Sequence, residues 1–394
     1  EETLPALARI LAKHHGFKCT VLFNIDPATG EIVAGNNNMP GIEALDSADL
    51  AVVFLRFQAF PEEQMKHFDA YLKRCGTVIG PRTTTHAFKG NPGPFTKYDF
   101  DYKGTDYELG FGHQVLGQTW VGHYGKNHQQ STRITIVPEK SAHPILRGVK
   151  DIWVQAGGYV GTPTDGDILT MAQPLNGMTP DSPPDETKPP QASEWTRSYK
   201  SASGTDARVF TSLYGTPEDI LNEGYRRMLV NAAFWAVGME DAIKPDLNVS
   251  FVGPFKPNTF GNQTHAAGVK PEQYAGWESP IPAHNNPNKP APKQPKGKAK
   301  QEAPAKQADA PKSAAAAAID AKPTVSTGKP ACFVRIEIPG ERKCLQIAEI
   351  EVMSGGKNVV KGAKATQSTT GHGGTAERAF DGNKSRLWGT GMTH

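Results

Sequence analysis

Three side chains suited to substrate binding and proton transfer follow two apolar runs of the chain. Arg56 comes directly after the run 50–55, and Arg82 and His86 come after the run 77–80. If both runs are parallel strands of one sheet, their carboxyl ends lie at the same edge, where ligands of open α/β sheets bind. Guanidinium groups orient an oxygen-rich substrate, and an imidazole moves protons to or from a hydroxyl or carbonyl group. We therefore predict that Arg56 and Arg82 bind substrate and that His86 is catalytic; the alternative is a histidine held by backbone hydrogen bonds in a loop.

A second group of candidates lies in residues 120–128. The sequence there is Trp-Val-Gly-His-Tyr-Gly-Lys-Asn-His, which places His123 and His128 in one glycine-containing loop. Both are predicted catalytic histidines, and Trp120 is predicted to stack on a sugar, with core packing as the alternative. Together with His86 they would also suit a divalent metal. Because the chain has no His-x-His or His-Glu-x-x-His pattern, we assign no metal ligand and leave the cofactor open.

Glu194 and Trp195 follow a segment rich in Pro, Asp and Ser, residues 175–193, which we expect to be a loop or lid. Glu194 is a candidate carboxylate for substrate binding, and Trp195 is a candidate platform for a sugar. A lone acid gives little support to glycoside hydrolysis, which uses two carboxylates. Asp219 is predicted to cap a helix instead.

The segments that position these residues alternate between helix and strand over residues 1–265. The continuous apolar run 50–55 is typical of a strand buried in a parallel sheet, and Pro61 followed by two glutamates indicates the start of a helix. The spacing of apolar residues predicts helices over 4–15, 62–72 and 223–237, and strands over 19–25, 50–55, 77–80, 133–137 and 207–213. The prediction is an α/β domain with a mainly parallel sheet.

The rest of the chain has a different composition. Residues 266–330 are predicted to be a Pro-, Lys- and Ala-rich linker. Over 278–330 Pro, Lys, Ala and Gln dominate and bury too little apolar surface to offset the entropy cost of ordering, so we predict that this basic stretch is disordered. Residues 331–394 contain alternating segments at 333–338 and 345–352 and a turn at Gly355-Gly356, which predict an all-β module.

Composition argues against several functional classes. The chain has 43 Lys and Arg against 40 Asp and Glu, a net charge of +3, which does not suggest a nucleic-acid binder. No apolar run approaches the roughly 20 residues of a membrane-spanning helix. The 4 cysteines show no Cys-x-x-Cys spacing and are too few for a disulfide scaffold.

Over roughly residues 1–255, several motifs resemble the ThuA-like (trehalose-utilisation) family and occur in its order. They are the strand 48–57 with the helix 62–72, the Val-Ile-Gly-Pro-Arg-Thr-Thr-Thr-His-Ala-Phe segment 78–88, Leu-Gly-Gln-Thr-Trp at 116–120 followed by His123, the His-Pro-Ile-Leu-Arg-Gly turn 143–148, and Asn222-Glu223-Gly224 with Arg226, Arg227, Asn231 and Trp235. The resemblance implies a flavodoxin-like, class I glutamine-amidotransferase-like fold and a role in sugar catabolism. The first strand of that fold is expected before Glu1.

Glutamine hydrolysis is not expected, although the implied fold is that of an amidotransferase. Such an enzyme would carry its nucleophilic cysteine directly after the strand 77–80, where this chain has Pro-Arg-Thr-Thr-Thr-His. Cys75 precedes that strand, at the wrong end of the sheet, so no thiolate is placed for the reaction.

The tail resembles a discoidin-type (coagulation-factor type C, galactose-binding-like) domain. The matching motifs are Ile-Ala-Glu-Ile-Glu-Val at 347–352, Ala363, Thr366-Gln367-Ser368, Ala-Phe-Asp-Gly-Asn at 379–383 and Trp388. They cover only the N-terminal half of such a β-sandwich. The resemblance implies a module that binds glycans or cell surfaces, and an Asp-Gly-Asn loop that either holds Ca²⁺ or is a plain turn.

Together these features predict a carbohydrate-processing protein, tethered to a glycan- or surface-binding module. The leading interpretation is an enzyme that acts on a disaccharide or keto-sugar by histidine-mediated hydrolysis, elimination or isomerisation; the alternative is a non-catalytic sugar-binding or scaffold protein. The expected partners are a carbohydrate substrate and a glycan or cell-surface ligand, without nucleic acid or a membrane span. A surface-binding module on a long linker favours an extracytoplasmic location, periplasmic or secreted, in a bacterium.

Overall fold

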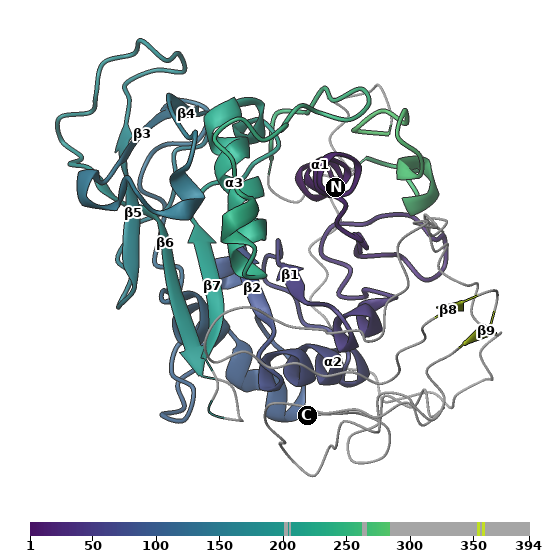
Figure 1. The fold of residues 1–394 in the computed structure, drawn as a ribbon. Helices are drawn as coiled ribbons and strands as arrows, with labels where there is room; N and C mark the ends of the chain where they lie inside the picture. Colours follow the sequence, from purple (N-terminus) through teal and green to yellow (C-terminus); the bar gives the residue numbers. More distant parts are fainter. Residues whose placement is uncertain (201–203, 205, 262–265, 284–352, 355–356, 359–394) are drawn as a thin grey trace. The chain divides into compact units, whose positions relative to one another are not determined.

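The computed structural model describes residues 1–200, 204, 206–261, 266–283, 353–354 and 357–358 (Figure 1). The chain divides into two units, Glu1–Pro323 and Thr324–His394. In the second unit, the described residues form two short antiparallel strands, β8 (Met353–Ser354) and β9 (Lys357–Asn358). The other strands predicted for the tail and residues 284–330 of the predicted linker lie outside the described residues.

The first unit is built on a seven-stranded mixed sheet with the order β1-β2-β7-β6-β5-β3-β4. In chain order the strands are β1 (Leu50–Val52), β2 (Thr77–Gly80), β3 (Thr132–Ile136), β4 (Ile152–Val154), β5 (Asp167–Pro174), β6 (Gln191–Lys200) and β7 (Asp206–Ser212). Only β1, β2 and β7 pair in parallel, whereas the pairs β7–β6, β6–β5, β5–β3 and β3–β4 are antiparallel. The α/β class is confirmed, but the prediction of a mainly parallel sheet is wrong. The connection from β5 to β6 contains no helix, and β6 and β7 are separated only by residues 201–205, too few for the crossover that parallel neighbours need.

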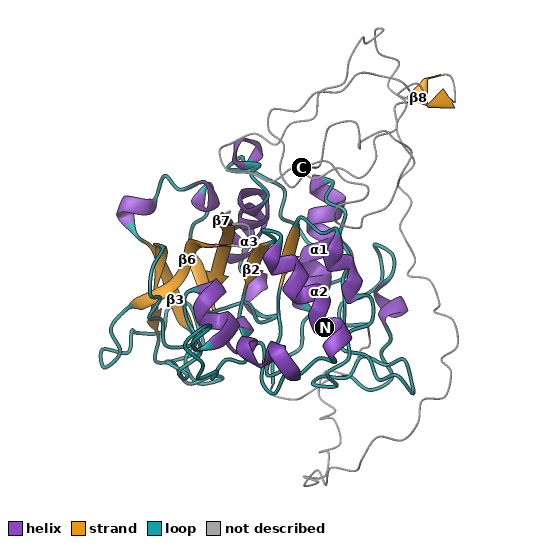
Figure 2. Ribbon diagram, turned by 90° about the horizontal axis from the view of Figure 1, so that it is seen from below, coloured by secondary structure: helices purple, strands orange, loops and turns teal. Residues whose placement is uncertain are grey.

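The three predicted helices are confirmed and cover both faces of the sheet. They are α1 (Thr3–His15), α2 (Glu62–Lys73) and α3 (Glu223–Ala236). Because successive side chains of a strand point to opposite faces, β2 feeds two apolar cores. Its Ile79 joins the core of α1 and α3, and its Val78 joins the core of α2. Helix α3 packs against β2, β4 and β7, and it lies near β2 and β7 in both views of the ribbon (Figures 1 and 2).

Two predicted segments differ in the structure. Residues 19–25 do not form a strand of the sheet, and only Ile25 makes an isolated bridge, to Ile32. Residues 266–283, which the sequence placed in the linker, pack on the α/β domain instead: Ile281 is buried, and Tyr274 stacks on Phe23 with the ring centroids 5.5 Å apart. Scattered apolar residues in this stretch therefore anchor it, despite its proline-rich composition.

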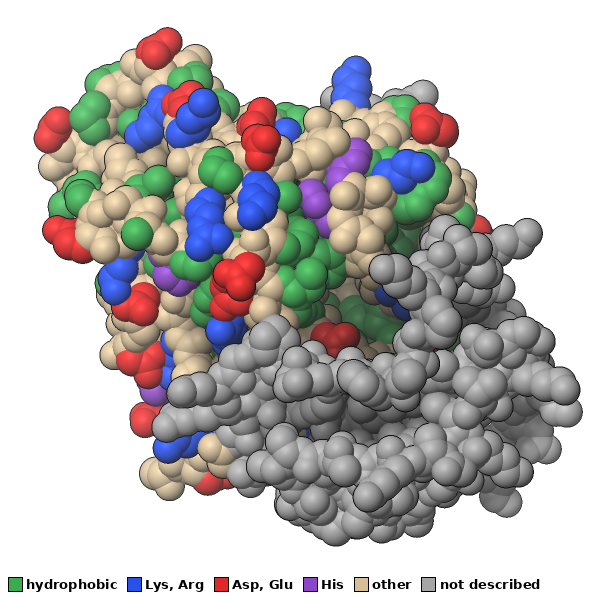
Figure 3. Space-filling view, viewed as in Figure 1, with side chains coloured by type: hydrophobic (Ala, Val, Ile, Leu, Met, Phe, Trp, Pro, Cys, Tyr) green, Lys and Arg blue, Asp and Glu red, His purple; other side chains and the backbone are tan. Residues whose placement is uncertain are grey.

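The surface of the first unit mixes charges of both signs. On the face shown in Figure 3, basic and acidic side chains are interspersed over the described part of the molecule. Among the described residues, no helix is both long and apolar enough to cross a membrane.

Candidate functional site

The loops that leave β1 and β2 are tied together by hydrogen bonds. The backbone N–H of Phe57 donates to the carbonyl oxygen of His86 at 2.8 Å. In the opposite direction, the hydroxyl of Thr83 donates to the carbonyl oxygen of Leu55 at 2.6 Å. Because β1 and β2 are parallel neighbours, both loops leave the same edge of the sheet. Arg56 and His86, which the sequence predicted to share a rim, therefore come from two loops that are bonded to each other.

The imidazole of His86 is enclosed by aromatic rings. Only 2% of the residue is exposed. Its ring centroid lies 4.8 Å from that of Phe57, 5.0 Å from that of Trp120 and 5.3 Å from that of Tyr159. A side-chain hydroxyl also approaches the imidazole, since Oγ1 of Thr85 lies 3.5 Å from Nδ1. His86 is thus part of the packing as well as a candidate for chemistry.

Arg82 lies beside His86 with a guanidinium group that is buried and incompletely bonded. The residue is 5% exposed, and its Nη1 atom is buried without a hydrogen-bond partner. The guanidinium carbon lies 4.4 Å from the ring centroid of Tyr159 and 5.2 Å from that of Phe260, so two aromatic rings contact the cation. A buried guanidinium nitrogen without a hydrogen-bond partner is unusual in a folded protein.

Arg56 is half-buried and likewise lies over an aromatic ring, with its guanidinium carbon 4.6 Å from the ring centroid of Phe57. No carboxylate pairs with Arg56 or Arg82 in the described part of the chain. The arginines that do form ion pairs there are Arg133, Arg197, Arg208 and Arg227. The edge of the sheet therefore carries two cations without counter-ions.

His123 and Trp120 complete this group. The backbone of His123 forms an antiparallel bridge with Tyr159, and the two ring centroids are 5.2 Å apart. Trp120 lies 6.1 Å from His123 between ring centroids, and its indole N–H is buried without a partner. We name the set of residues formed by Arg56, Phe57, Arg82, His86, Trp120, His123 and Tyr159 the strand-end cluster.

The environment of the cluster keeps both imidazoles neutral. Burial, followed by the charges of Arg56 and Arg82 and the nearby His123, lowers the pKa of His86 to about 3. Burial and the same two arginines also lower the pKa of His123. At neutral pH each imidazole therefore has one N–H donor and one nitrogen lone pair that can accept, and the charge of the cluster comes from the guanidinium groups.

The low pKa of His86 predicts a loss of stability in acid. Its pKa in the folded protein lies below the value of about 6.5 in an unfolded chain, so the unfolded state takes up the proton first as the pH falls below about 6.5. Between pH 6.5 and 5 the free energy of unfolding is expected to fall by about 2 kcal/mol more in the wild type than in His86→Gln. Urea denaturation at the two pH values measures this difference, and an equal fall in both proteins would contradict it.

The structure places His128 outside the cluster. His128 is exposed, and its imidazole packs on Phe260 with the ring centroids 4.5 Å apart. Phe260 in turn contacts the guanidinium group of Arg82. The described residues contain no group of three His, Cys, Asp or Glu side chains placed to hold a metal ion. The three-histidine site that the sequence allowed is therefore not formed here.

Glu194 and Trp195 are core residues of β6. Both are fully buried. The Glu194 carboxyl group accepts hydrogen bonds at 2.7 Å from the hydroxyls of Ser193 and Ser212, and burial raises its pKa. The indole N–H of Trp195 donates to the carbonyl oxygen of Leu116 at 2.7 Å. The sequence proposed them as a carboxylate and a platform for substrate, but their contacts are internal and do not include the cluster.

Asp219 positions the cluster, a role that the sequence did not reveal. It is fully buried, and its carboxylate accepts four backbone N–H bonds. The donors, at 2.9–3.0 Å, are Gln155, Ala156, Gly215 and Thr216. These bonds join the turn before Tyr159 to the segment after β7, where the carbonyl oxygen of Tyr214 accepts the backbone N–H of Arg82 at 2.9 Å. An acid before a helix has the same sequence signature as an ordinary cap, so the sequence predicts a cap at Asp219.

The chain has a distant structural neighbour among solved proteins. No family model matches the chain, and no curated protein matches it. Among solved structures, it is similar to a protein from Parabacteroides merdae ATCC 43184 that is named ThuA-like. The two are 17% identical, the alignment covers 58% of this chain and 82% of that one, and the TM-score is 0.35. Membership of the ThuA-like family therefore stays a proposal that depends on the motifs of the sequence.

Proposed function

We propose that this protein is a carbohydrate-processing enzyme of the ThuA-like type, with its active site at the strand-end cluster and His86 as its proton-transfer group. The observation that carries the proposal is that the ring of Tyr159 contacts both the neutral imidazole of His86 and the guanidinium group of Arg82, whose buried Nη1 atom has no partner. The Nη1 atom of Arg82 provides a hydrogen-bond donor for a ligand oxygen, and the imidazole of His86 provides a lone pair that can accept a proton.

The composition of the cluster favours elimination or isomerisation of a keto-sugar over hydrolysis. Removing a proton next to a carbonyl group needs one base and donors that stabilise the developing oxyanion. His86 supplies the base, and the guanidinium groups of Arg56 and Arg82 supply the donors. Glycoside hydrolysis would need two carboxyl groups, and none of the residues that make up the cluster carries one. His123, at the more exposed side, would return the proton.

The alternative is a sugar-binding protein without catalysis. The aromatic rings of Phe57, Trp120 and Tyr159 around His86 would serve a binder equally well, because sugar faces stack on such rings. A turnover assay separates the two functions, because an enzyme converts its sugar and a binding protein does not.

The test is a screen of the intact protein against disaccharides and keto-sugars, with and without added divalent metal, with products followed by NMR. We expect conversion of at least one keto-sugar. Binding across the panel without any conversion would contradict the enzyme and favour the binder.

We further propose that the C-terminal residues 331–394 bind a glycan or cell surface and that the protein works outside the cytoplasm. The support is the resemblance of this segment to discoidin-type modules and the basic linker before it. Retention of the intact protein, but not of residues 1–283, on an immobilised glycan array would support this, and equal retention of both would contradict it.

A further inference from the structure

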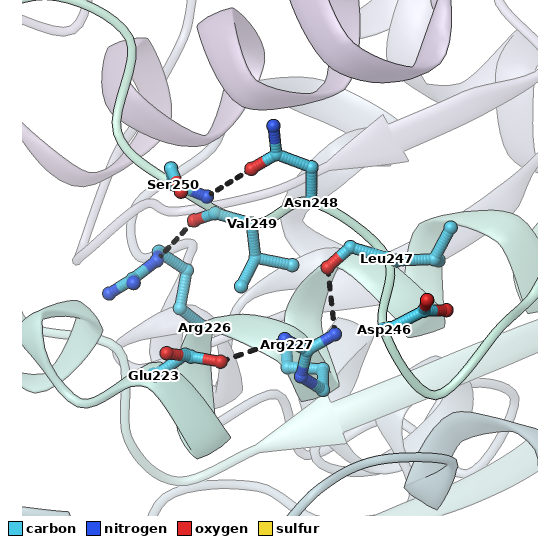
Figure 4. A pocket seen from close by; sticks show the side chains of 8 residues that line it. All are labelled: Glu223, Arg226, Arg227, Asp246, Leu247, Asn248, Val249 and Ser250. Atoms are coloured by element: carbon cyan, nitrogen blue, oxygen red, sulfur yellow. Dashed lines mark hydrogen bonds and ion pairs between the residues drawn. The ribbon is translucent and has the colours of Figure 1, made fainter.

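Among the described residues, Arg82 differs from the other buried arginines, whose guanidinium groups are well satisfied. Arg226 is buried to a similar extent, and it donates from Nε to the carbonyl oxygen of Val249 and from Nη1 to that of Ile220, both at 2.6 Å. Arg227 donates to the carbonyl oxygen of Leu247 at 2.8 Å and pairs with Glu223. Both line an open pocket of about 270 Å³ together with Asp246 and Asn248 (Figure 4). Because its arginines are already bonded and it contains two acids, this pocket offers no free cation to an anionic ligand.

Arg82 has the opposite arrangement. Its Nη1 atom is buried without a partner, and aromatic rings cover the guanidinium group in place of a carboxylate. Arg56, which comes from the neighbouring loop, also lacks an ion pair among the described residues. A buried guanidinium group is stabilised by a bonded anion, and its planar array of donors fits carboxylate and phosphate oxygens.

We propose that the ligand of the strand-end cluster is an anionic sugar whose oxyanion, a carboxylate or a phosphate, is bound by Arg82 with the help of Arg56. The inference rests on the proposed function, because it names the class of substrate that the site takes. The sugar ring would lie against Trp120, whose ring borders His86, and against Tyr159, whose ring borders both Arg82 and His86.

An anionic substrate would also make His86 a stronger base than it is in the free protein. In the free protein, the two arginines add to burial in disfavouring protonation of His86. An oxyanion bound between them offsets their charge, so the pKa of His86 rises when substrate binds. The ligand thus supplies the negative charge that the cluster lacks.

Calorimetric titration of the intact protein at pH 7 tests the proposal. The ligands are glucuronate and gluconate as carboxylates, glucose 6-phosphate as a phosphate, glucose as the neutral sugar, and inorganic phosphate and acetate as bare anions. We expect at least one anionic sugar to bind at least about tenfold more tightly than glucose, and Arg82→Met to weaken that binding about 10- to 100-fold. Which anionic sugar binds identifies the oxyanion as carboxylate or phosphate.

The control is Arg133→Met, which removes an arginine of β3 that pairs with the exposed Asp151 and should leave all affinities unchanged. Thermal melts check that the variants fold. If Arg82→Met does not fold, Arg56→Met is used in its place, and it should also weaken binding of the anionic sugar. Equal binding of neutral and anionic sugars would overturn this inference while leaving the proposed function intact. Binding of bare anions through Arg82 without any sugar would support an oxyanion site but overturn the proposed function. Binding of no ligand overturns both.

Discussion

Replacing His86 by glutamine is expected to lower turnover of the sugar substrate by about 10²- to 10⁴-fold, the usual effect of removing a general acid or base. Glutamine can occupy the space between Phe57, Trp120 and Tyr159 but cannot take up a proton. Alanine is the poorer choice, because His86 is buried and truncation would leave a cavity among those rings. Steady-state kinetics on the substrate found by the screen measure the effect, and thermal melts confirm that the variant folds.

The matched control is His67→Gln. His67 is a half-buried histidine of α2 that pairs with Asp46, on a helix that contributes no residue to the cluster. The His67→Gln variant should turn over substrate at the wild-type rate. If His86→Gln also kept near-normal turnover, His86 would not be the proton-transfer group, and the sugar-binding function would be favoured.

Of the substitutions proposed here, Asp219→Ala is expected to lower the free energy of unfolding most, by about 3–5 kcal/mol. The substitution leaves four buried backbone N–H groups without their acceptor. It also unties the turn before Tyr159 from the segment that holds the backbone of Arg82, so binding to the cluster should weaken as well. Urea denaturation measures the stability.

Asp167→Ala is the control for that measurement. Asp167 is exposed and forms a surface ion pair with Lys140, so its loss should cost no more than about 1 kcal/mol. If Asp219→Ala were as stable as this control, the four hydrogen bonds would not hold the two segments together as described.

The sequence was sufficient to predict the half of the fold that follows simple periodic patterns. The helices 4–15, 62–72 and 223–237 have clear apolar faces, and all three exist. Strand β6 was missed because polar side chains such as Ser193 and Glu194 are buried in it and bonded to one another. Buried polar residues remove the alternation by which a strand is recognised.

The candidate site was likewise predictable only where simple strand patterns place its residues. Arg56, Arg82 and His86 could be predicted because parallel strands deliver their following residues to one edge of the sheet. His128 could not be excluded, because spacing within a loop does not fix the direction of a side chain. Tyr159 could not be found, because a long-range backbone bridge to His123 brings it to the site.

The most direct test of the account is a crystal structure of the protein with the anionic sugar that binds most tightly. The account predicts that the sugar lies at the strand-end cluster, with its oxyanion within hydrogen-bond distance of Arg82 Nη1 and a ring oxygen, hydroxyl or carbonyl facing the imidazole of His86. A sugar bound in the pocket of Arg226 and Arg227 instead (Figure 4), with the strand-end cluster unoccupied, would contradict it.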